Sequence, residues 1–166
     1  IVYREMYVSK VLAEDLAEMI LDAEQGDGPI QYGVLDSSCW HKRGDTGPSI
    51  AERMVLKGCR WRPSDRSKGT RISGKNEMHR RLQVDEFTEE PRMTIFNTCN
   101  HLISQLPTIP LDKKNAEDID TNYAHDHLYD ALRYGIMSRP RFGIFDYDPA
   151  TARPNAQYLA DPVMGY

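Results

Sequence analysis

The stretch Lys114–Arg139, KNAEDIDTNYAHDHLYDALRYGIMSR, carries the clearest structural pattern in the chain. It begins acidic and then predicts a helix over Asp126–Met137, because apolar residues recur at the three- and four-residue spacing of a buried helix face. Asp126, His127 and Asp130 stand at the N-terminal end of this helix. His127 and Asp130 are three residues apart and are expected to project from one side of the first turn, where the helix dipole favours an ionised carboxylate.

Two interpretations fit this cluster. In the first, it is an acidic N-terminal turn that caps the helix and stays solvated. In the second, the carboxylate and the imidazole meet at the turn and bind a divalent metal ion. The residues themselves leave both interpretations open.

Length and composition indicate one domain, or part of one, because the chain has 166 residues of which 40% are apolar. No apolar run approaches the roughly 18 residues of a membrane-spanning helix, and no signal-peptide pattern opens the chain. The three cysteines, Cys39, Cys59 and Cys99, are odd in number and widely spaced. They are therefore expected to be free thiols in a reducing cytoplasm, not a disulfide framework or a zinc site.

The net charge of −4 conceals a basic segment, Lys57–Arg81. This segment holds nine lysines and arginines against two acids, Asp65 and Glu77, whereas the rest of the chain is strongly acidic. A basic segment in an acidic protein is typical of a polyanion-binding surface. An ordinary solvated face fits the charge pattern equally well.

Helical and extended patterns alternate along the chain, which predicts an α/β fold with a mixed central sheet flanked by helices. The expected strands are Ile1–Val8, Ile30–Leu35, Arg60–Pro63 and Met93–Phe96. The expected helices are Leu12–Glu24, Ser49–Lys57, Arg71–Leu82, Asn97–Leu106 and Asp126–Met137. Residues 139–166 contain four prolines and little periodicity, so we expect a tail that wraps the domain or docks on a partner.

Asp36 follows directly after the expected strand Ile30–Leu35. In open α/β sheets, ligands bind outside the carboxyl ends of the strands, which makes Asp36 a candidate site residue. The alternative is a structural role, since Asp-Ser-Ser is ordinary turn chemistry. The glycine-containing segment that follows, HKRGDTGPS, lacks the spacing of a phosphate-binding P-loop, so no ATPase motif is expected in this chain.

Three runs of the sequence resemble, in the correct order, the nuclease domain of a tailed-phage terminase large subunit. They are YGVLDSSCW, CRWRPSDRSKGTRISG and AEDIDTNYAHDHLYDALRYGIMSRP. The resemblance implies a ribonuclease H-like fold over residues 1–138 and a metal-dependent endonuclease that cleaves concatemeric double-stranded DNA during genome packaging. It also implies a location in the host cell cytoplasm, an ATPase domain upstream, and a portal protein and small terminase subunit as partners.

The resemblance also assigns roles to individual residues. Asp36 matches the carboxylate at the end of the middle strand, and Asp130 matches the carboxylate on the last helix, with His127 and Asp126 assisting. Such sites hold two Mg²⁺ or Mn²⁺ ions about 3.5–4 Å apart. The family's first acidic ligand lies upstream of the segment that matches Ile1–Val8, and no residue here replaces it. We therefore expect a nuclease domain that lacks its first strand hairpin.

The basic segment supplies the expected DNA contacts, namely Arg66, Lys68, Arg71 and Lys75. The missing first carboxylate keeps a second hypothesis open, in which the chain is a non-catalytic module that docks on DNA or on the portal. A third hypothesis, a transposase or resolvase of the same fold, is disfavoured by the terminase-like segments WRPSDRSKG and DHLYDALRYG.

Overall fold

The computed structural model describes residues 1–42, 44, 47–120, 123 and 126–139, and shows a mixed α/β fold with a small parallel sheet. In this part of the chain the sheet consists of β1 (Gly33–Leu35) and β2 (Trp61–Pro63). Gly33 lies opposite Trp61 in the register. The predicted α/β class is confirmed, whereas the predicted larger mixed sheet is not found in the described residues.

Close packing of an indole ring explains why glycine opens β1. A Cβ atom added to Gly33 would lie only 2.1 Å from a ring carbon of Trp61. The ring therefore occupies the space that any larger residue at position 33 would need. The predicted strand Ile30–Leu35 is correspondingly shorter in the structure, because its pairing begins only where the Gly33 N–H donates to the Arg60 carbonyl at 2.7 Å.

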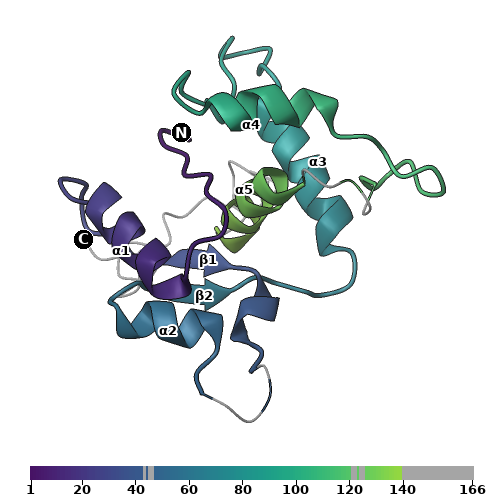
Figure 1. Ribbon diagram of the computed structural model, residues 1–166. Coiled ribbons are helices and arrows are strands. Elements are labelled where there is room, and N and C mark those ends of the chain that lie inside the picture. The colour runs from purple at the N-terminus through teal and green to yellow at the C-terminus, as the bar shows by residue number, and fades with distance from the viewer. Residues whose placement is uncertain (43, 45–46, 121–122, 124–125, 140–166) are drawn as a thin grey trace, which may run out of the picture.

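One side of the sheet is covered by α1 (Ala13–Ala23) and α2 (Ile50–Leu56) (Figure 1). Helix α2 begins with a capping box, in which the Ser49 and Glu52 side chains each bind the other residue's backbone N–H. Small residues allow the two helices to approach closely. The core on this side is built from Ala13, Ala17, Met54 and Cys59.

The other side of the sheet is covered by α5 (His127–Ser138), which packs on β1 and on α3 (Thr70–Leu82) (Figure 1). A second core lies among these elements and consists of Met78, Met93, Ile119, Tyr129 and Ile136. The apolar spacing that predicted α5 is used for packing only in part, because Ile136 is buried and Leu132 packs against this core, whereas Ala131 is exposed. The helix places its N-terminal turn beside the carboxyl end of β1.

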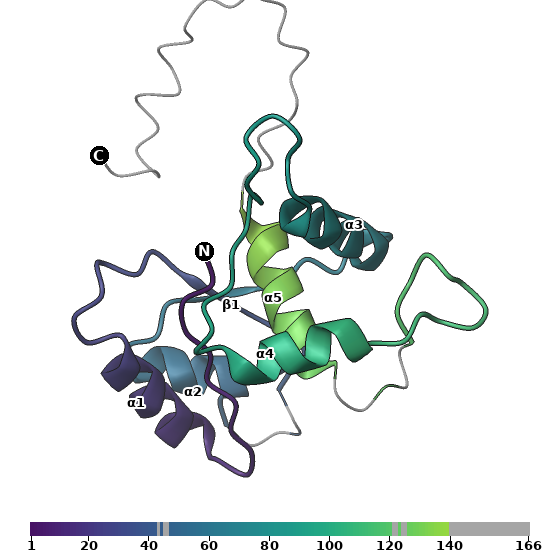
Figure 2. The ribbon, with the colours of Figure 1, turned by 90° about the horizontal axis from the view of Figure 1, so that it is seen from above.

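The N-terminal segment was predicted to be a strand over Ile1–Val8, and this prediction is wrong. Only Val2 pairs, in a parallel bridge with Ile95, and the segment runs beside the chain that leads into α4 (Asn100–Gln105) (Figure 2). The pairing stops because the Glu5 carboxylate instead accepts hydrogen bonds from the His101 and Leu102 backbone N–H groups at 2.9 and 3.0 Å.

The structure differs from two other predictions near α4. The predicted strand Met93–Phe96 is wrong, because only Ile95 forms a bridge. The predicted helix Asn97–Leu106 begins later, at Asn100, since Cys99 N–H still bonds the Phe96 carbonyl in a turn. A short 3₁₀ helix, Leu106–Thr108, follows α4, where Pro107 ends the α-helical pattern.

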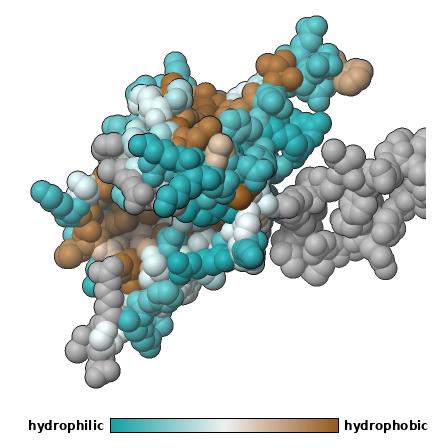
Figure 3. Space-filling view, turned by 90° about the vertical axis from the view of Figure 1, so that its right-hand side faces the viewer, coloured by the Kyte–Doolittle hydropathy of each residue, from teal (hydrophilic) through white to brown (hydrophobic). Residues whose placement is uncertain are grey.

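The three cysteines form no disulfides. Within the described ranges, no helix is long and apolar enough to cross a membrane. Hydrophobic side chains on the face shown in Figure 3 lie in separate patches among hydrophilic ones. The predicted proline-rich tail, apart from Arg139, lies outside the described residues.

Candidate active site

The carboxyl ends of β1 and β2 are tied together by hydrogen bonds. Ser64, directly after β2, donates from its backbone N–H to the Leu35 carbonyl at 2.8 Å. Its buried hydroxyl accepts a hydrogen bond from the Ser37 backbone N–H at 3.1 Å. These contacts fix the position of Asp36, which lies between Leu35 and Ser37.

Asp36 combines a structural role with an open position at the sheet edge. One carboxylate oxygen, Oδ1, accepts a hydrogen bond from the Ser38 backbone N–H at 2.6 Å and caps the 3₁₀ helix Ser37–Trp40. The other oxygen, Oδ2, accepts a hydrogen bond of 2.5 Å from the hydroxyl of Tyr134 on α5. The turn interpretation of Asp36 is therefore right for one oxygen, while the other faces α5.

Asp130 approaches the same hydroxyl from the first turn of α5. Its Oδ2 atom lies 3.4 Å from the Tyr134 hydroxyl oxygen. Since that hydroxyl is 2.5 Å from Asp36 Oδ2, the two carboxylate oxygens are roughly 6 Å apart at most. The structure thus brings together the two residues that the sequence singled out as candidate catalytic carboxylates.

A buried arginine neutralises Asp130. The Arg133 side chain is only 5% exposed and donates from Nε and Nη2 to Asp130 Oδ1 at 3.1 and 2.8 Å. Its guanidinium also lies 4.5 Å from the centre of the Tyr134 ring. Helix α3 leaves room for the Arg133 stem at Gly74, where an added Cβ would lie 2.6 Å from Arg133 Cγ.

These groups line a cavity of about 390 Å³ at the edge of the sheet. Five aspartates contribute to its wall, namely Asp36, Asp65, Asp118, Asp126 and Asp130. Two arginines of the basic segment, Arg66 and Arg71, line the same cavity. The cavity therefore combines carboxylates that can bind a cation with guanidinium groups that can bind a phosphate.

The hydrogen bonds set the protonation of the central pair. Burial acts to raise the pKa of Asp36, but the hydrogen bonds from Ser38 and Tyr134 outweigh it and hold the pKa below its usual value. Burial and the hydrogen bond to Asp36 raise the pKa of Tyr134 well above its usual value. At neutral pH, Asp36 is therefore an ionised acceptor and Tyr134 a protonated donor.

His127 is not brought to this cavity. Its side chain is 76% exposed, and its Nδ1 atom lies 3.5 Å from Asp126 Oδ1. The three-residue spacing placed His127 and Asp130 on one side of the turn, but as the first residue of α5 His127 extends into solvent. Asp126 stands at the N-cap position without a side-chain capping bond and lines the cavity instead.

The four predicted DNA-binding residues are placed differently. Arg66 and Arg71 line the cavity, and Arg71 Nη2 lies 3.4 Å from Asp118 Oδ1. Lys75 Nζ donates to the Ala116 carbonyl at 3.4 Å. Lys68 is exposed on the loop before α3, outside the set of residues that line the cavity.

The carboxylates that face each other fit one hard cation better than two. No group of three or more His, Cys, Asp or Glu side chains in the described ranges is arranged to hold a metal ion. Asp36 and Asp130 can supply two oxygens to a Mg²⁺ or Mn²⁺ ion, which commonly takes its remaining ligands from water and phosphate. Two ions bound side by side would need further ligands beyond these residues.

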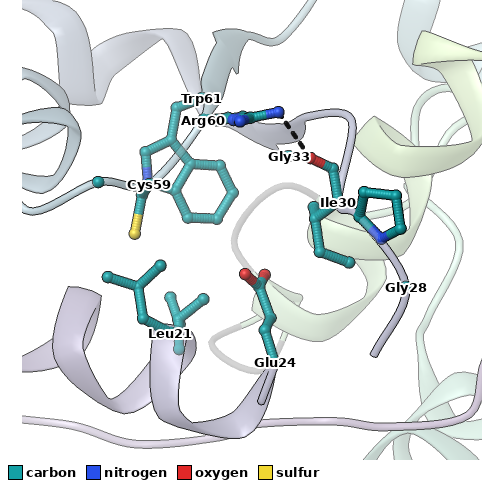
Figure 4. Close-up of a pocket in the computed structure, with 11 residues that line it drawn as sticks. Leu21, Glu24, Gly28, Ile30, Gly33, Cys59, Arg60 and Trp61 are labelled. Atoms are coloured by element: carbon teal, nitrogen blue, oxygen red, sulfur yellow. Dashed lines mark hydrogen bonds between the residues drawn. The ribbon is translucent and has the colours of Figure 1, made fainter. Parts of the chain in front are cut away.

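A second cavity, of about 270 Å³, lies between α1 and the start of β1 (Figure 4). It is largely apolar, with Leu21, Ile30 and Trp61 around it and the Glu24 carboxylate pointing inward. Arg60 closes one side by donating to the Ile30 carbonyl at 3.4 Å. With one carboxylate, Glu24, and one cation, Arg60, this cavity lacks the group of carboxylates found in the first and is a gap beside the smaller core.

Sequence reasoning missed two residues that organise the site. Arg133 and Tyr134 are three and four residues after Asp130, so all three lie on one face of α5. The sequence did contain a signal for them. Asp130, Arg133 and Tyr134 are polar residues at helical spacing, and they interrupt an otherwise apolar face of α5. Asp118 was also missed, since no local pattern relates the acidic loop to Arg71.

Comparison with known proteins gives no independent support for any family. No family model, no curated protein and no solved structure matches this chain.

Proposed function

We propose that this chain is the nuclease domain of a terminase large subunit, with a ribonuclease H-like fold, and that it hydrolyses phosphodiester bonds in double-stranded DNA during genome packaging. The observation that carries the proposal is the convergence of Asp36 and Asp130 on the Tyr134 hydroxyl. These carboxylates come from a strand end and a helix, the two kinds of element from which the resembled family draws them.

In this proposal Asp36 and Asp130 would hold a Mg²⁺ or Mn²⁺ ion, which would supply the activation of water and the neutralisation of phosphate charge that phosphodiester hydrolysis needs. The protein's own groups place the substrate. Arg66 and Arg71 bind phosphate oxygens at the cavity wall, which aligns the DNA backbone over the two carboxylates. Arg133 fixes the orientation of Asp130, and the Tyr134 hydrogen bond keeps Asp36 ionised in the metal-free protein, ready to bind the ion.

The wider assembly is proposed on the same resemblance. Double-stranded DNA would be the substrate, the portal protein and small terminase subunit would be partners, and an ATPase domain would supply translocation. The host cell cytoplasm is the corresponding place of action.

Plasmid cleavage tests this function. Asp36→Asn and Asp130→Asn should each reduce nicking of supercoiled plasmid in Mn²⁺ by about 100-fold or more, because each removes a charge that holds the ion. Glu86→Gln, a charge-matched change on an exposed loop outside the cavity, should leave the rate unchanged. Undiminished nicking by either asparagine variant would overturn the assignment.

The non-catalytic docking module remains the second candidate, and one observation favours it. Asp130 is already paired with Arg133, and the described residues present no three-ligand metal group. In that case both asparagine variants would bind DNA as well as the unaltered chain, and Mn²⁺ would not bind at this cavity at millimolar concentration.

A further inference from the structure

A third hollow, of about 210 Å³, adjoins the acidic cavity. The two hollows share Arg133 and Tyr134 as part of their walls, along with Asp65 and Thr70. A chain of nucleotides bound over Asp36 and Asp130 would therefore reach this hollow within a short distance. The remaining wall is partly apolar, with Val34, Pro63 and Met137.

One side of the hollow is a stacked pair. The Arg62 guanidinium carbon lies 4.0 Å from the centre of the Tyr32 ring. The Tyr32 hydroxyl donates to the Ser138 carbonyl at 3.1 Å, which anchors the ring to the last turn of α5. Arg62 itself is exposed, so the guanidinium face turned away from Tyr32 is accessible.

We propose that this hollow binds one unpaired nucleobase, that of the nucleotide next to the phosphate held by Arg66 and Arg71. The proposal rests on the function proposed above and names the substrate form that the site accepts. Nucleobases stack on guanidinium planes and aromatic rings, and the Arg62 guanidinium carbon already lies over the Tyr32 ring. The apolar side chains of Val34 and Met137 can pack against the face of a base that has left the duplex.

The proposal has a direct consequence for the substrate. A base in an intact duplex is stacked between its neighbours and cannot enter the hollow. The site therefore favours a strand that is locally open, such as a single-stranded stretch or a frayed end. Intact double-stranded DNA must open by at least one nucleotide before it can fill both hollows.

Binding without divalent ions tests the base contact separately from cleavage. Fluorescence anisotropy in EDTA compares a short oligothymidine with a fully abasic oligomer of the same length. The unaltered chain should bind the oligothymidine about fivefold more tightly or better, the lower end expected for one stacked base. Arg62→Met should abolish this preference. Arg60→Met, a matched loss of charge at a residue that lines the other cavity, should keep it.

Equal binding of the two oligomers, binding of neither, or a preference retained in Arg62→Met would overturn the subsite. Tyr32→Phe should keep the preference, because the ring remains, and a melting curve for each variant checks that it is folded. A chain that cuts plasmid but shows no base preference refutes the subsite alone. A chain that shows the preference but does not cut refutes the proposed chemistry alone.

Discussion

The hydroxyl of Tyr134 donates a 2.5 Å hydrogen bond to Asp36, and this contact links the last helix to the end of the first strand. Because Asp130 lies one helical turn before Tyr134, the same hydroxyl also faces its carboxylate at 3.4 Å. Two acidic residues from distant parts of the chain are thereby held in one cavity. The predictions below follow from this arrangement and from the groups that support it.

Removal of the Tyr134 hydroxyl should shift the pH dependence of cleavage. In Tyr134→Phe, Asp36 loses a hydrogen bond that lowers its pKa, while burial, which raises the pKa, remains. The pKa of Asp36 should therefore rise, and the acid limb of the rate profile should move to higher pH. Nicking rates between about pH 4 and pH 8 in Mn²⁺ measure the shift, and an unchanged acid limb would contradict it.

The two glycines of α3 and α5 should respond in opposite ways to alanine. Gly74→Ala places a methyl group 2.6 Å from Arg133 Cγ and 2.9 Å from Cδ. The buried arginine must move, so we expect a loss of about 1–3 kcal/mol in the free energy of unfolding and a weaker hold on Asp130. Urea unfolding and nicking rates both report the change.

Gly135→Ala is the control, because among the described residues no atom beyond its chain neighbours and the backbone of its own helix lies within 4 Å of the added carbon. Alanine is the better helix former, and the free energy of unfolding should rise by about 0.5–1 kcal/mol with activity retained. Equal effects of the two substitutions would show that α3 does not position Arg133.

The free energy of unfolding should fall in acid because Glu77 becomes protonated. The hydrogen bond from Arg80, with that from Arg81, lowers the pKa of Glu77 to about 2, although burial opposes the shift. The ionised Glu77 carboxylate thus contributes its full share to the free energy of unfolding above the ordinary pKa of 4.5. This share is lost as the pH falls towards 2. Glu77→Gln should cost about 1–2 kcal/mol at pH 7, and the difference from the unaltered chain should vanish near pH 2 in urea unfolding. A difference that stays constant with pH would contradict this account.

The salt dependence of DNA binding should identify the arginines that contact phosphate. Replacing Arg66 and Arg71 together with methionine should lower the slope of log affinity against log salt by roughly one unit per lost contact. Arg80→Met is the matched control, because that guanidinium is already paired with Glu77 at 2.7 Å. Lys68→Met and Lys75→Met, tested singly, should have smaller effects. A slope that is unchanged in the double variant would make the basic segment an ordinary solvated face.

The sequence predicted the helices better than the strands. Helices α1 and α5 follow from apolar spacing, which depends only on neighbouring residues. The extended segments Ile1–Val8 and Met93–Phe96 have strand-like composition, yet they pair only at Val2 and Ile95, because strand formation depends on partners elsewhere in the chain.

In the candidate site, too, the features that depend on distant parts of the chain could not be predicted from the sequence. Asp36 and Asp130 were selected through the resemblance to terminase nucleases, since their places after a strand and on a helix fit a turn or cap role as well. Their convergence on the Tyr134 hydroxyl could not be predicted, because it depends on how α5 crosses β1. The exposure of His127 could not be predicted from the sequence either. The three-residue spacing determines a helix face but not the direction of a side chain in the first turn of the helix.

The location of a bound Mn²⁺ ion tests the central claim most directly. A crystal grown with millimolar Mn²⁺ and measured at a wavelength where manganese scatters anomalously shows each bound ion. We predict one peak between Asp36 and Asp130, at about 2.1 Å from a carboxylate oxygen of each, with Tyr134 displaced or rotated away. An absence of density there, with Asp36 still bonded to Tyr134 and Asp130 still paired with Arg133, would contradict the proposed metal-dependent nuclease.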